Sequence, residues 1–287
     1  MATPHSDNLV FQGEKHPLVC QNPRSPEEHC LALIHRKAYE VAAELAAGKV
    51  VLDLGCNNGY GTRILAESAD RIIGVDVSPS AIATARQGDV LPNVEFHVIE
   101  GDRLPFESGM FGCLVSFQVI EHVVDVDAYL REATRVLAPQ GTAVFTTPNR
   151  HIRLDPGMKP WNRFHVVEYG ADDLADVLAS YFSDVNIRGL FAVPEIYDIE
   201  YARVQRSLRT ARSPVHSYLE RFARMVLPAS ALSLARGARA AMTADRENAG
   251  GHRVPMAELT TEGLYYQAED HDSSLDLMAV CRTGGDG

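Results

Sequence analysis

The sequence predicts an α/β protein with a doubly wound, mainly parallel sheet of seven strands and a helical insertion before the last strand. Short apolar segments alternate with helix-compatible segments from residue 26 to residue 192, which is typical of a parallel sheet covered on both faces. The first apolar segment, 50–54, runs directly into a glycine-rich turn at 55–61, and a helical segment follows. That order brings the turn to the sheet edge where ligands bind.

The individual elements follow from local signals. The first helix begins at Pro26 and stops before Gly48, and Ser78-Pro79 opens a later helix with proline in its first turn. Further helices are expected from the glycine turn to about Ser68, at Asp127–Leu137 and at Ala171–Tyr181. The expected strands are Val50–Leu54, Arg71–Val77, Val94–Ile99, Gly112–Phe117, Gly141–Thr147, Val185–Leu190 and Ser274–Arg282.

Composition restricts the class of protein. A hydrophobic share of 46% and a charged share of 23% over 287 residues are ordinary for a globular chain with a full core. No apolar run is long enough to span a bilayer, the N-terminus lacks signal-peptide features, and the five cysteines are scattered. We therefore expect a cytoplasmic protein without a disulfide framework. The net charge of −11 argues against general nucleic-acid binding.

Charge is unevenly distributed, and this suggests a division of the chain. Between residues 203 and 253, ten arginines face three acids, which gives this segment a charge of about +7. We divide the chain into an N-terminal arm and helix (1–48), a core (49–192 and 262–287) and a helical basic insertion (193–261). The insertion could form a lid, attract an anionic acceptor or membrane surface, or be a solvated helical face. Its helices could also form homodimer contacts, whereas the absence of an aromatic-rich basic module argues against specific RNA binding.

The residues around the glycine turn narrow the choice of ligand. Asp76 ends the second strand 23 residues beyond Asp53, at the distance where an acid accepts ribose hydroxyls. The turn lacks the G-x-G-x-x-G spacing of dinucleotide enzymes, and Asp53 would repel a phosphate. A ligand with a ribose, a base and a cationic amino group fits better, and S-adenosylmethionine has all three.

The set of motifs resembles the class I S-adenosylmethionine-dependent methyltransferases. It comprises Asp53-x-Gly55-Cys56-x-x-Gly59, Asp76, Gly101-Asp102, Phe117–His122 and Arg135-Val136-Leu137-x-x-x-Gly141. The resemblance implies a Rossmann-like methyltransferase fold in which Asp76 holds the ribose and Asp102 the adenine amino group. The cofactor site that it implies consists of Asp53, Gly55, Cys56, Asn57, Gly59, Asp76, Val77, Asp102, Arg103 and Gln118, with Arg36 and Tyr39 from the preceding helix.

The segment after the fourth strand carries the candidate catalytic groups. Gln118, Glu121 and His122 would share one face of a helix. The ubiquinone-type O-methyltransferases and the small-RNA 2′-O-methyltransferases have Glu-x-x-Glu-His here, and in those families the motif holds a divalent cation. The RNA enzymes add a histidine from the region that matches His165. By this resemblance Mg²⁺ would be bound by Gln118, Glu121, His122 and His165, although Gln118 replaces an acid. Without a metal, Glu121 would cap the helix and His122 would pack against the cofactor.

A further resemblance concerns the acceptor. The segments FQVIEH, TPNR, N-x-F-H-x-x-E and DSSLDL are similar to those of bacterial sugar O-methyltransferases, including enzymes of methylmannose polysaccharide synthesis. This implies methyl transfer to a hydroxyl of a sugar, glycan or glycosylated acceptor, with His165 or His122 as the base and Glu121 as a further catalytic candidate. We favour His165 near the acceptor, and Trp161 could stack on a sugar ring or pack internally. Two alternatives stay open: a phenolic or polyketide-like acceptor, and a methyltransferase-like protein that binds the cofactor without catalysis.

Overall fold

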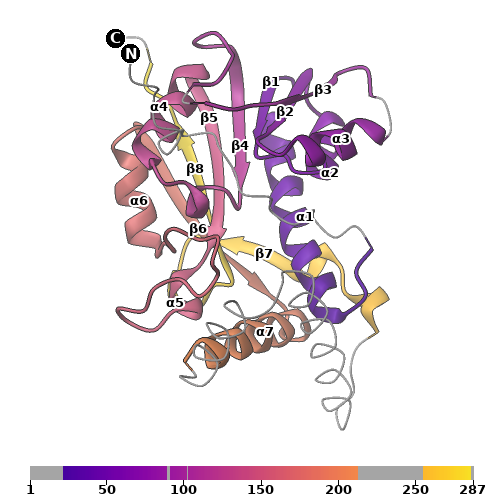
Figure 1. Cartoon of the computed structure of the whole chain (residues 1–287), viewed down its shortest axis with the longest axis vertical. Helices are drawn as coiled ribbons and strands as arrows, with labels where there is room; N and C mark the ends of the chain where they lie inside the picture. The colour runs from indigo at the N-terminus through magenta and orange to yellow at the C-terminus, as the bar shows by residue number, and fades with distance from the viewer. Residues whose placement is uncertain (1–21, 89–90, 102, 213–254, 286–287) are drawn as a thin grey trace, which may run out of the picture.

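A single sheet of eight strands forms the centre of the molecule (Figure 1). The computed structural model describes residues 22–88, 91–101, 103–212 and 255–285, and the structural statements below concern these residues. The strand order across the sheet is β3-β2-β1-β4-β5-β8-β6-β7. The strands are β1 (Val50–Leu54), β2 (Arg71–Asp76), β3 (Val94–Val98), β4 (Phe111–Phe117), β5 (Leu137–Pro148), β6 (Asp184–Ala192), β7 (Leu264–Gln267) and β8 (Asp276–Arg282).

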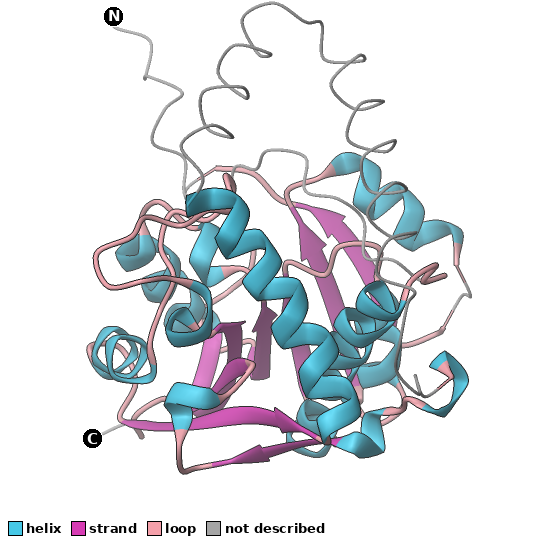
Figure 2. Ribbon diagram, turned by 90° about the horizontal axis from the view of Figure 1, so that it is seen from below, coloured by secondary structure: helices cyan, strands magenta, loops and turns pink. Residues whose placement is uncertain are grey.

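Helices lie on both sides of the strands (Figure 2). The first helix begins after Ser25, whose hydroxyl accepts the N–H of Glu28, and the third begins after Ser78, whose hydroxyl accepts the N–H of Ala81. The α-helices are α1 (Pro26–Ala46), α2 (Tyr60–Ala66), α3 (Pro79–Gln87), α4 (Val126–Val136), α5 (Arg150–Arg153), α6 (Ala171–Ala179) and α7 (Pro194–Arg212).

The doubly wound α/β class is confirmed, but the strand count was one too low. Strands β1 to β5 pair in parallel, whereas β8 runs antiparallel to both β5 and β6, and β7 pairs antiparallel with β6 at the sheet edge. The sheet is therefore mixed, with an antiparallel side. Sequence reasoning missed β7 because LYYQ is only four residues long and its pairing partner lies about 75 residues earlier in the chain.

Alternation along β1 distributes its side chains between two cores. Leu52 and Leu54 belong to the core that α4 and α6 cover, whereas Val51 belongs to the core that α1 and α2 cover. Since successive side chains of a strand point to opposite faces, Asp53 points toward α1 and α2. A buried acid is thus placed directly below the glycine turn.

The described part of the basic insertion is helical, as expected. Helix α7 packs on α1 and α5, and three of its four arginines form ion pairs: Arg203 with Glu200 on the same helix, Arg206 with Glu27, and Arg212 with Asp155. These cations are therefore neutralised within the protein. The other six arginines of the insertion lie outside the described residues, so membrane contact and homodimer formation through it stay predictions.

Two further properties concern the described residues. No helix among them is long and apolar enough to cross a bilayer. The four cysteines that fall within these ranges, Cys30, Cys56, Cys113 and Cys281, are buried free thiols.

The strand directions collect the candidate functional residues at one edge. Strands β1, β2, β4 and β5 are parallel to one another, so their C-terminal ends all lie at this edge. The antiparallel strand β8 begins at that edge, with Asp276 opposite Pro148. Residues that follow a parallel strand and residues that start β8 therefore meet.

Candidate active site

A cavity of about 940 Å³ opens at this edge of the sheet. Its size is in the range of small-molecule and cofactor sites. One end is formed by the turn after β1 and the end of β2, and includes Gly55, Cys56, Asn57, Asp76 and Val77. The other end extends past the end of β4 to His122 and the segment 161–166. A single cavity thus joins the expected cofactor residues to the expected catalytic segment.

The glycine turn requires residues that tolerate a left-handed backbone. The φ angles are +91° at Gly55, +49° at Asn57 and +76° at Gly59. A Cβ at Gly55 would lie 2.4 Å from a methyl group of Val119, and one at Gly59 would lie 2.6 Å from the ring of Phe96. Both glycines are therefore needed for close approach as well as for conformation.

The N–H groups of this turn already have acceptors. Those of Gly55 and Cys56 donate to the carbonyl of Val75 at 2.8 and 2.9 Å, and that of Asn57 donates to the Asp76 carboxylate at 2.9 Å. The next two residues donate within the turn itself. A pyrophosphate cradle needs N–H groups that point at the ligand. This geometry does not offer them, which agrees with a ligand that presents a cationic group here.

Asp76 connects the two strands that form the cofactor end. One carboxylate oxygen accepts the N–H of Asn57, and the other accepts the N–H of Ser78 at 2.8 Å. The side chain is partly exposed and lines the cavity. Since each carboxylate oxygen has two lone pairs, both can accept a further hydrogen bond from a ligand hydroxyl.

Asp53 does not reach the cavity, which corrects its expected contact with the ligand. It is completely buried, and its carboxylate accepts hydrogen bonds from Thr62 at 2.6 Å and from Tyr39 at 3.3 Å. Burial raises the pKa of Asp53 to about 7. Its position ties α1 and α2 together beneath the turn, so it supports the site from below.

Of the other expected cofactor residues, some line the cavity and others do not. Tyr39 lines the cavity, whereas Arg36 is exposed, pairs with Glu40 at 2.9 Å and is not among the lining residues. Arg103 is also exposed and does not line the cavity. Asp102 lies outside the described residues, so its expected contact with adenine stays a prediction.

The expected helical face at 118–122 is wrong in its geometry. Gln118 has a φ of +56°, and the residues after it form a 3₁₀ turn, Ile120–His122. The side-chain amide of Gln118 donates to the Asp276 carboxylate at 2.8 Å and does not join Glu121 and His122. Because the backbone of Gln118 is left-handed, this residue does not belong to a helix with Glu121, and the two side chains do not share a helical face.

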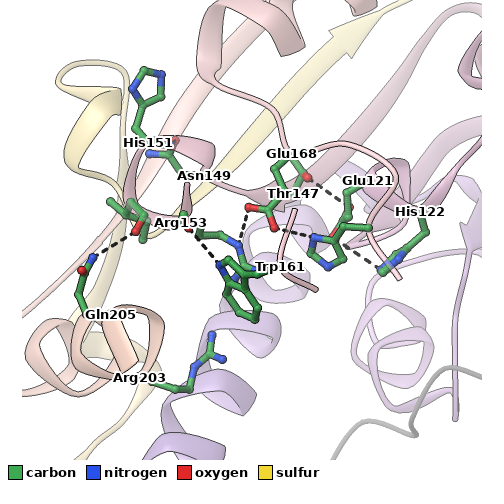
Figure 3. Close-up of polar contacts among 12 residues, drawn as sticks. Glu121, His122, Thr147, Asn149, His151, Arg153, Trp161, Glu168, Arg203 and Gln205 are labelled. Atoms are coloured by element: carbon green, nitrogen blue, oxygen red, sulfur yellow. Dashed lines mark hydrogen bonds and ion pairs between the residues drawn. The ribbon is translucent and has the colours of Figure 1, made fainter. Parts of the chain in front are cut away.

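Glu121 and His122 do converge with His165. One ligand atom from each of the three lies within 4.8 Å of the others. Glu121 is only 1% exposed; one carboxylate oxygen accepts from Thr147 at 3.2 Å, and the other has no hydrogen-bond partner among the described residues (Figure 3). That second oxygen lies 3.9 Å from Nε2 of His122. Burial raises the pKa of Glu121 to about 8.

Hydrogen bonds fix the protonated nitrogen of both histidines. Nδ1 of His122 donates to the carbonyl of Phe164 at 2.8 Å, and Nδ1 of His165 lies 3.0 Å from the Glu168 carboxylate. In each neutral ring Nε2 is then the basic nitrogen. His122 lines the cavity, whereas His165 lies behind it with 5% of its side chain exposed. The geometry thus favours His122 over His165 as the group that faces an acceptor.

The same three side chains suit a divalent cation. Two imidazoles and one carboxylate are a donor set typical of Mn²⁺, Fe²⁺ or Zn²⁺ more than of Mg²⁺, which prefers oxygen ligands. The unpartnered oxygen of Glu121 and the fixed Nδ1 atoms of both rings agree with such a site. The structure does not place Gln118 with them.

Sequence reasoning missed part of the site. Asp276 is buried, lines the cavity and accepts from Gln118, and burial raises its pKa. In the sequence, Asp276 was marked only by the resemblance of the DSSLDL segment. It reaches the site because β8 runs antiparallel to β5 and therefore begins at this edge of the sheet. Trp161 lines the cavity, and its indole N–H donates to the Arg153 carbonyl at 3.0 Å; stacking on a sugar ring stays a prediction.

Comparison with known proteins shows which proteins the central part is similar to. Residues 52–145 match the sequence model of the methyltransferase domain family. This match covers about a third of the chain, so the likeness to methyltransferases concerns its central part. The match begins inside β1 and ends inside β5, so it includes the glycine turn, Asp76 and the His122 segment.

Two curated relatives are similar to part of this chain in sequence. A protein of Mycobacterium tuberculosis named "probable S-adenosylmethionine-dependent methyltransferase" is 36% identical over 168 residues, which cover 58% of this chain and 60% of that protein. A ubiquinone biosynthesis O-methyltransferase of Pseudomonas fluorescens is 32% identical over 108 residues, which cover 37% of this chain and 47% of the enzyme. The chain thus spans less than two thirds of the length of these relatives.

Two solved structures share the fold of this chain. The crystal structure of the [4+2]-cyclase SpnF matches with a TM-score of 0.56 at 18% identity, over 98% of this chain and 89% of that one. The YcgJ protein from Bacillus subtilis matches with a TM-score of 0.51 at 17% identity, over 88% of this chain and 100% of that one. At these identities the likeness concerns the fold alone.

Proposed function

We propose that this protein transfers a methyl group from S-adenosylmethionine to a hydroxyl group of a sugar or glycosylated acceptor. The observation that carries the proposal is the single cavity in which the Asp76 end and His122 face one ligand space. Asp76 and the turn after β1 would hold the cofactor, and His122 would lie on the acceptor side. The assignment of a sugar rests on the resemblance of the FQVIEH, TPNR and DSSLDL segments.

The reaction would be an in-line displacement. The acceptor oxygen forms a bond to the methyl carbon while the carbon–sulfur bond breaks, and its electron pair stays on sulfur, giving S-adenosylhomocysteine. The hydroxyl proton would pass to Nε2 of His122, which the hydrogen bond to Phe164 keeps as the basic nitrogen. The cavity walls would hold oxygen and methyl carbon about 3 Å apart, which removes most of the entropic cost of their encounter.

A divalent cation would be held by Glu121, His122 and His165. When bound, it would lower the pKa of a coordinated hydroxyl. One nitrogen cannot be both ligand and base, so with the cation bound His122 would only hold and orient. The pairing of His165 with Glu168 and of His122 with Phe164 would then keep both rings in place.

A second acceptor class is favoured by the walls at the cavity mouth. Val124 and Val166 are 82% and 51% exposed, and both line the cavity beside Val123 and Phe164. Exposed apolar side chains grouped at a cavity mouth are typical of a site for an apolar ligand. A phenolic or polyketide-like hydroxyl would suit this mouth, as would a glycoside with an apolar aglycone.

Methyl transfer from labelled S-adenosylmethionine tests the proposal and separates the acceptors. The panel pairs each free sugar with its phenyl glycoside and with the corresponding phenol, and each is assayed with EDTA, Mg²⁺ and Mn²⁺. Labelled sugar or glycoside supports the first proposal, and labelled phenol alone replaces it with the second. Turnover abolished by EDTA and restored by Mn²⁺ supports the cation site, whereas turnover that survives EDTA assigns proton removal to His122 alone. Saturable cofactor binding without transfer to any acceptor would favour a non-catalytic protein.

A further inference from the structure

An ion pair behind the cavity wall links the candidate histidines to the rest of the fold. Nε of Arg153 lies 2.7 Å from one carboxylate oxygen of Glu168, and the other oxygen lies 3.0 Å from Nδ1 of His165. Arg153 is 6% and Glu168 2% exposed, and neither lines the cavity. Both oxygens of Glu168 are thus engaged, one by the guanidinium and one by the imidazole.

A buried pair of this kind is not explained by stability alone. Removing two charges from water costs free energy that their attraction repays only with good geometry, and apolar pairs of similar volume often stabilise a protein as well or better. Arg153 and Glu168 lie on separate segments, α5 and the loop before α6, so no helix periodicity brings them together. Their contact with His165 offers a reason for keeping charges here.

The pair determines the state of the His165 ring. The guanidinium of Arg153 donates to one oxygen of Glu168 at 2.7 Å and pairs with this buried group as a carboxylate. An ionised carboxylate can only accept, so Nδ1 of His165 must carry the proton. The His165 ring then packs edge to face on His122, with ring centroids 4.7 Å apart and planes at 90°. A rotation of His165 would disturb the ring that faces the cavity.

Arg153 also contacts Trp161, which lines the cavity. Its guanidinium carbon lies 4.4 Å from the centre of the Trp161 ring, and its carbonyl accepts the Trp161 N–H at 3.0 Å (Figure 3). The short helix that carries it is held on two sides: the Asn149 side chain caps its start and donates to the Ser274 carbonyl, and Gln205 of α7 donates to the Ile152 carbonyl at 3.3 Å. Arg153 therefore occupies a fixed position between Trp161 and Glu168.

We propose that Arg153 and Glu168 are positioning residues, which hold the His165 ring in its Nδ1–H tautomer and, through it, the His122 ring against the cavity. This role rests on the proposed function, in which His122 faces the acceptor. It requires no contact between the pair and a substrate. In this proposal the contact of α7 with α5 also matters for the site, because α7 holds in place the segment that carries Arg153.

The test compares two double variants that each replace an ion pair by apolar residues of similar size. R153M/E168L removes the pair behind His165. E132L/R135M removes the Arg135–Glu132 pair, which has the same 2.7 Å separation but lies on α4, outside the cavity lining. The first readout is the ¹⁵N spectrum of the histidine rings in the purified full chain, which distinguishes the two tautomers without cofactor or acceptor.

The ¹⁵N signals of His165 are identified as those that disappear in His165→Ala. In wild type and in E132L/R135M we expect these signals to show a protonated Nδ1. In R153M/E168L they should be replaced by a mixture with the Nε2–H tautomer. Given an acceptor, kcat should fall at least tenfold in R153M/E168L while the Kd for S-adenosylmethionine changes less than threefold. An unchanged His165 tautomer in folded R153M/E168L would overturn the proposal.

A second variant covers the case in which R153M/E168L does not fold. Glu168→Asp keeps both charges but is one methylene shorter, so the carboxylate cannot reach His165 and Arg153 together. We expect this variant to fold and to show an altered His165 signal set. Wild-type signals in Glu168→Asp would contradict the proposal. Because the spectra need no turnover, this outcome is independent of whether methyl transfer is detected.

Discussion

The carboxylate of Asp76 lies 2.9 Å from the backbone nitrogen of Asn57, so the acid at the end of β2 shapes the turn after β1. The same carboxylate also accepts the N–H of Ser78 at the start of α3. Asp76 thus orders the site as well as facing the ligand space. A ligand that binds to Asp76 would bind to a turn already in its final conformation, which lowers the entropic cost of binding.

Asp76→Ala should weaken S-adenosylmethionine binding at least tenfold, since the variant loses both the proposed acceptor of the ribose hydroxyls and the acceptor of the Asn57 N–H. Isothermal titration measures the Kd. Glu95→Ala is the matched control, because it removes an exposed acid on the neighbouring strand whose ion pairs within the described part of the chain are with Arg71 and His97. Equal Kd values for Asp76→Ala and wild type would remove Asp76 from the cofactor site.

Gly55→Ala should abolish cofactor binding, because the added Cβ would meet Val119 at 2.4 Å in a residue with φ of +91°. Gly157→Ala separates the two causes: its φ is +77°, but a Cβ there meets no atom within 4 Å. Gly157→Ala should therefore cost only about 1 kcal/mol of stability and leave the Kd unchanged. Gly55→Ala/Val119→Ala should recover part of the affinity; no recovery would show that the clash is not the cause.

His122→Ala should reduce kcat by about 10²-fold or more and leave the Kd for S-adenosylmethionine within threefold of wild type. The reason is that a positioned base contributes about 10² to 10⁴ in rate, whereas Asp76 and the glycine turn would hold the cofactor. Single-turnover kinetics with the best acceptor measures the loss. A fall in cofactor affinity as large as the fall in kcat would assign His122 to the cofactor instead.

Stability should fall with rising pH because of Glu121. Its pKa rises from 4.5 in a solvated chain to about 8 in the folded protein, so the folded state keeps a proton that the unfolded chain releases. The stabilisation is complete below about pH 4.5 and is lost as the pH rises through 8. Glu121→Gln keeps the neutral shape at all pH values. In EDTA, its Tm relative to wild type should therefore rise between pH 5 and pH 8; a constant difference would contradict the buried carboxyl.

Most of the fold could be predicted from sequence, because its signals are local. The bounds of β1 were predicted to the residue, and Gly48 and Ser78 marked the end of α1 and the start of α3. The edge strand β7 and the antiparallel placement of Asp276 depend on pairings between distant segments. No local pattern encodes them.

The candidate site was predictable in its residue types more than in its geometry. Glu121, His122 and His165 were expected together and lie together. Gln118 was expected with them because i, i+3 and i+4 share a helical face, but its left-handed backbone turns it toward Asp276. Whether Asp53 reached the ligand depended on which face of β1 it occupied. Similarly, whether His165 or His122 faced the cavity depended on the packing of one ring behind the other.

The most direct measurement is a titration of the purified full chain with S-adenosylmethionine, S-adenosylhomocysteine and NADH. The turn has its N–H groups engaged, Asp76 offers carboxylate acceptors, and the cavity continues to His122. We therefore predict saturable one-to-one binding of both S-adenosyl compounds in the micromolar range, with no binding of NADH. Binding of NADH in preference to S-adenosylmethionine, or no binding of either S-adenosyl compound, would contradict the account.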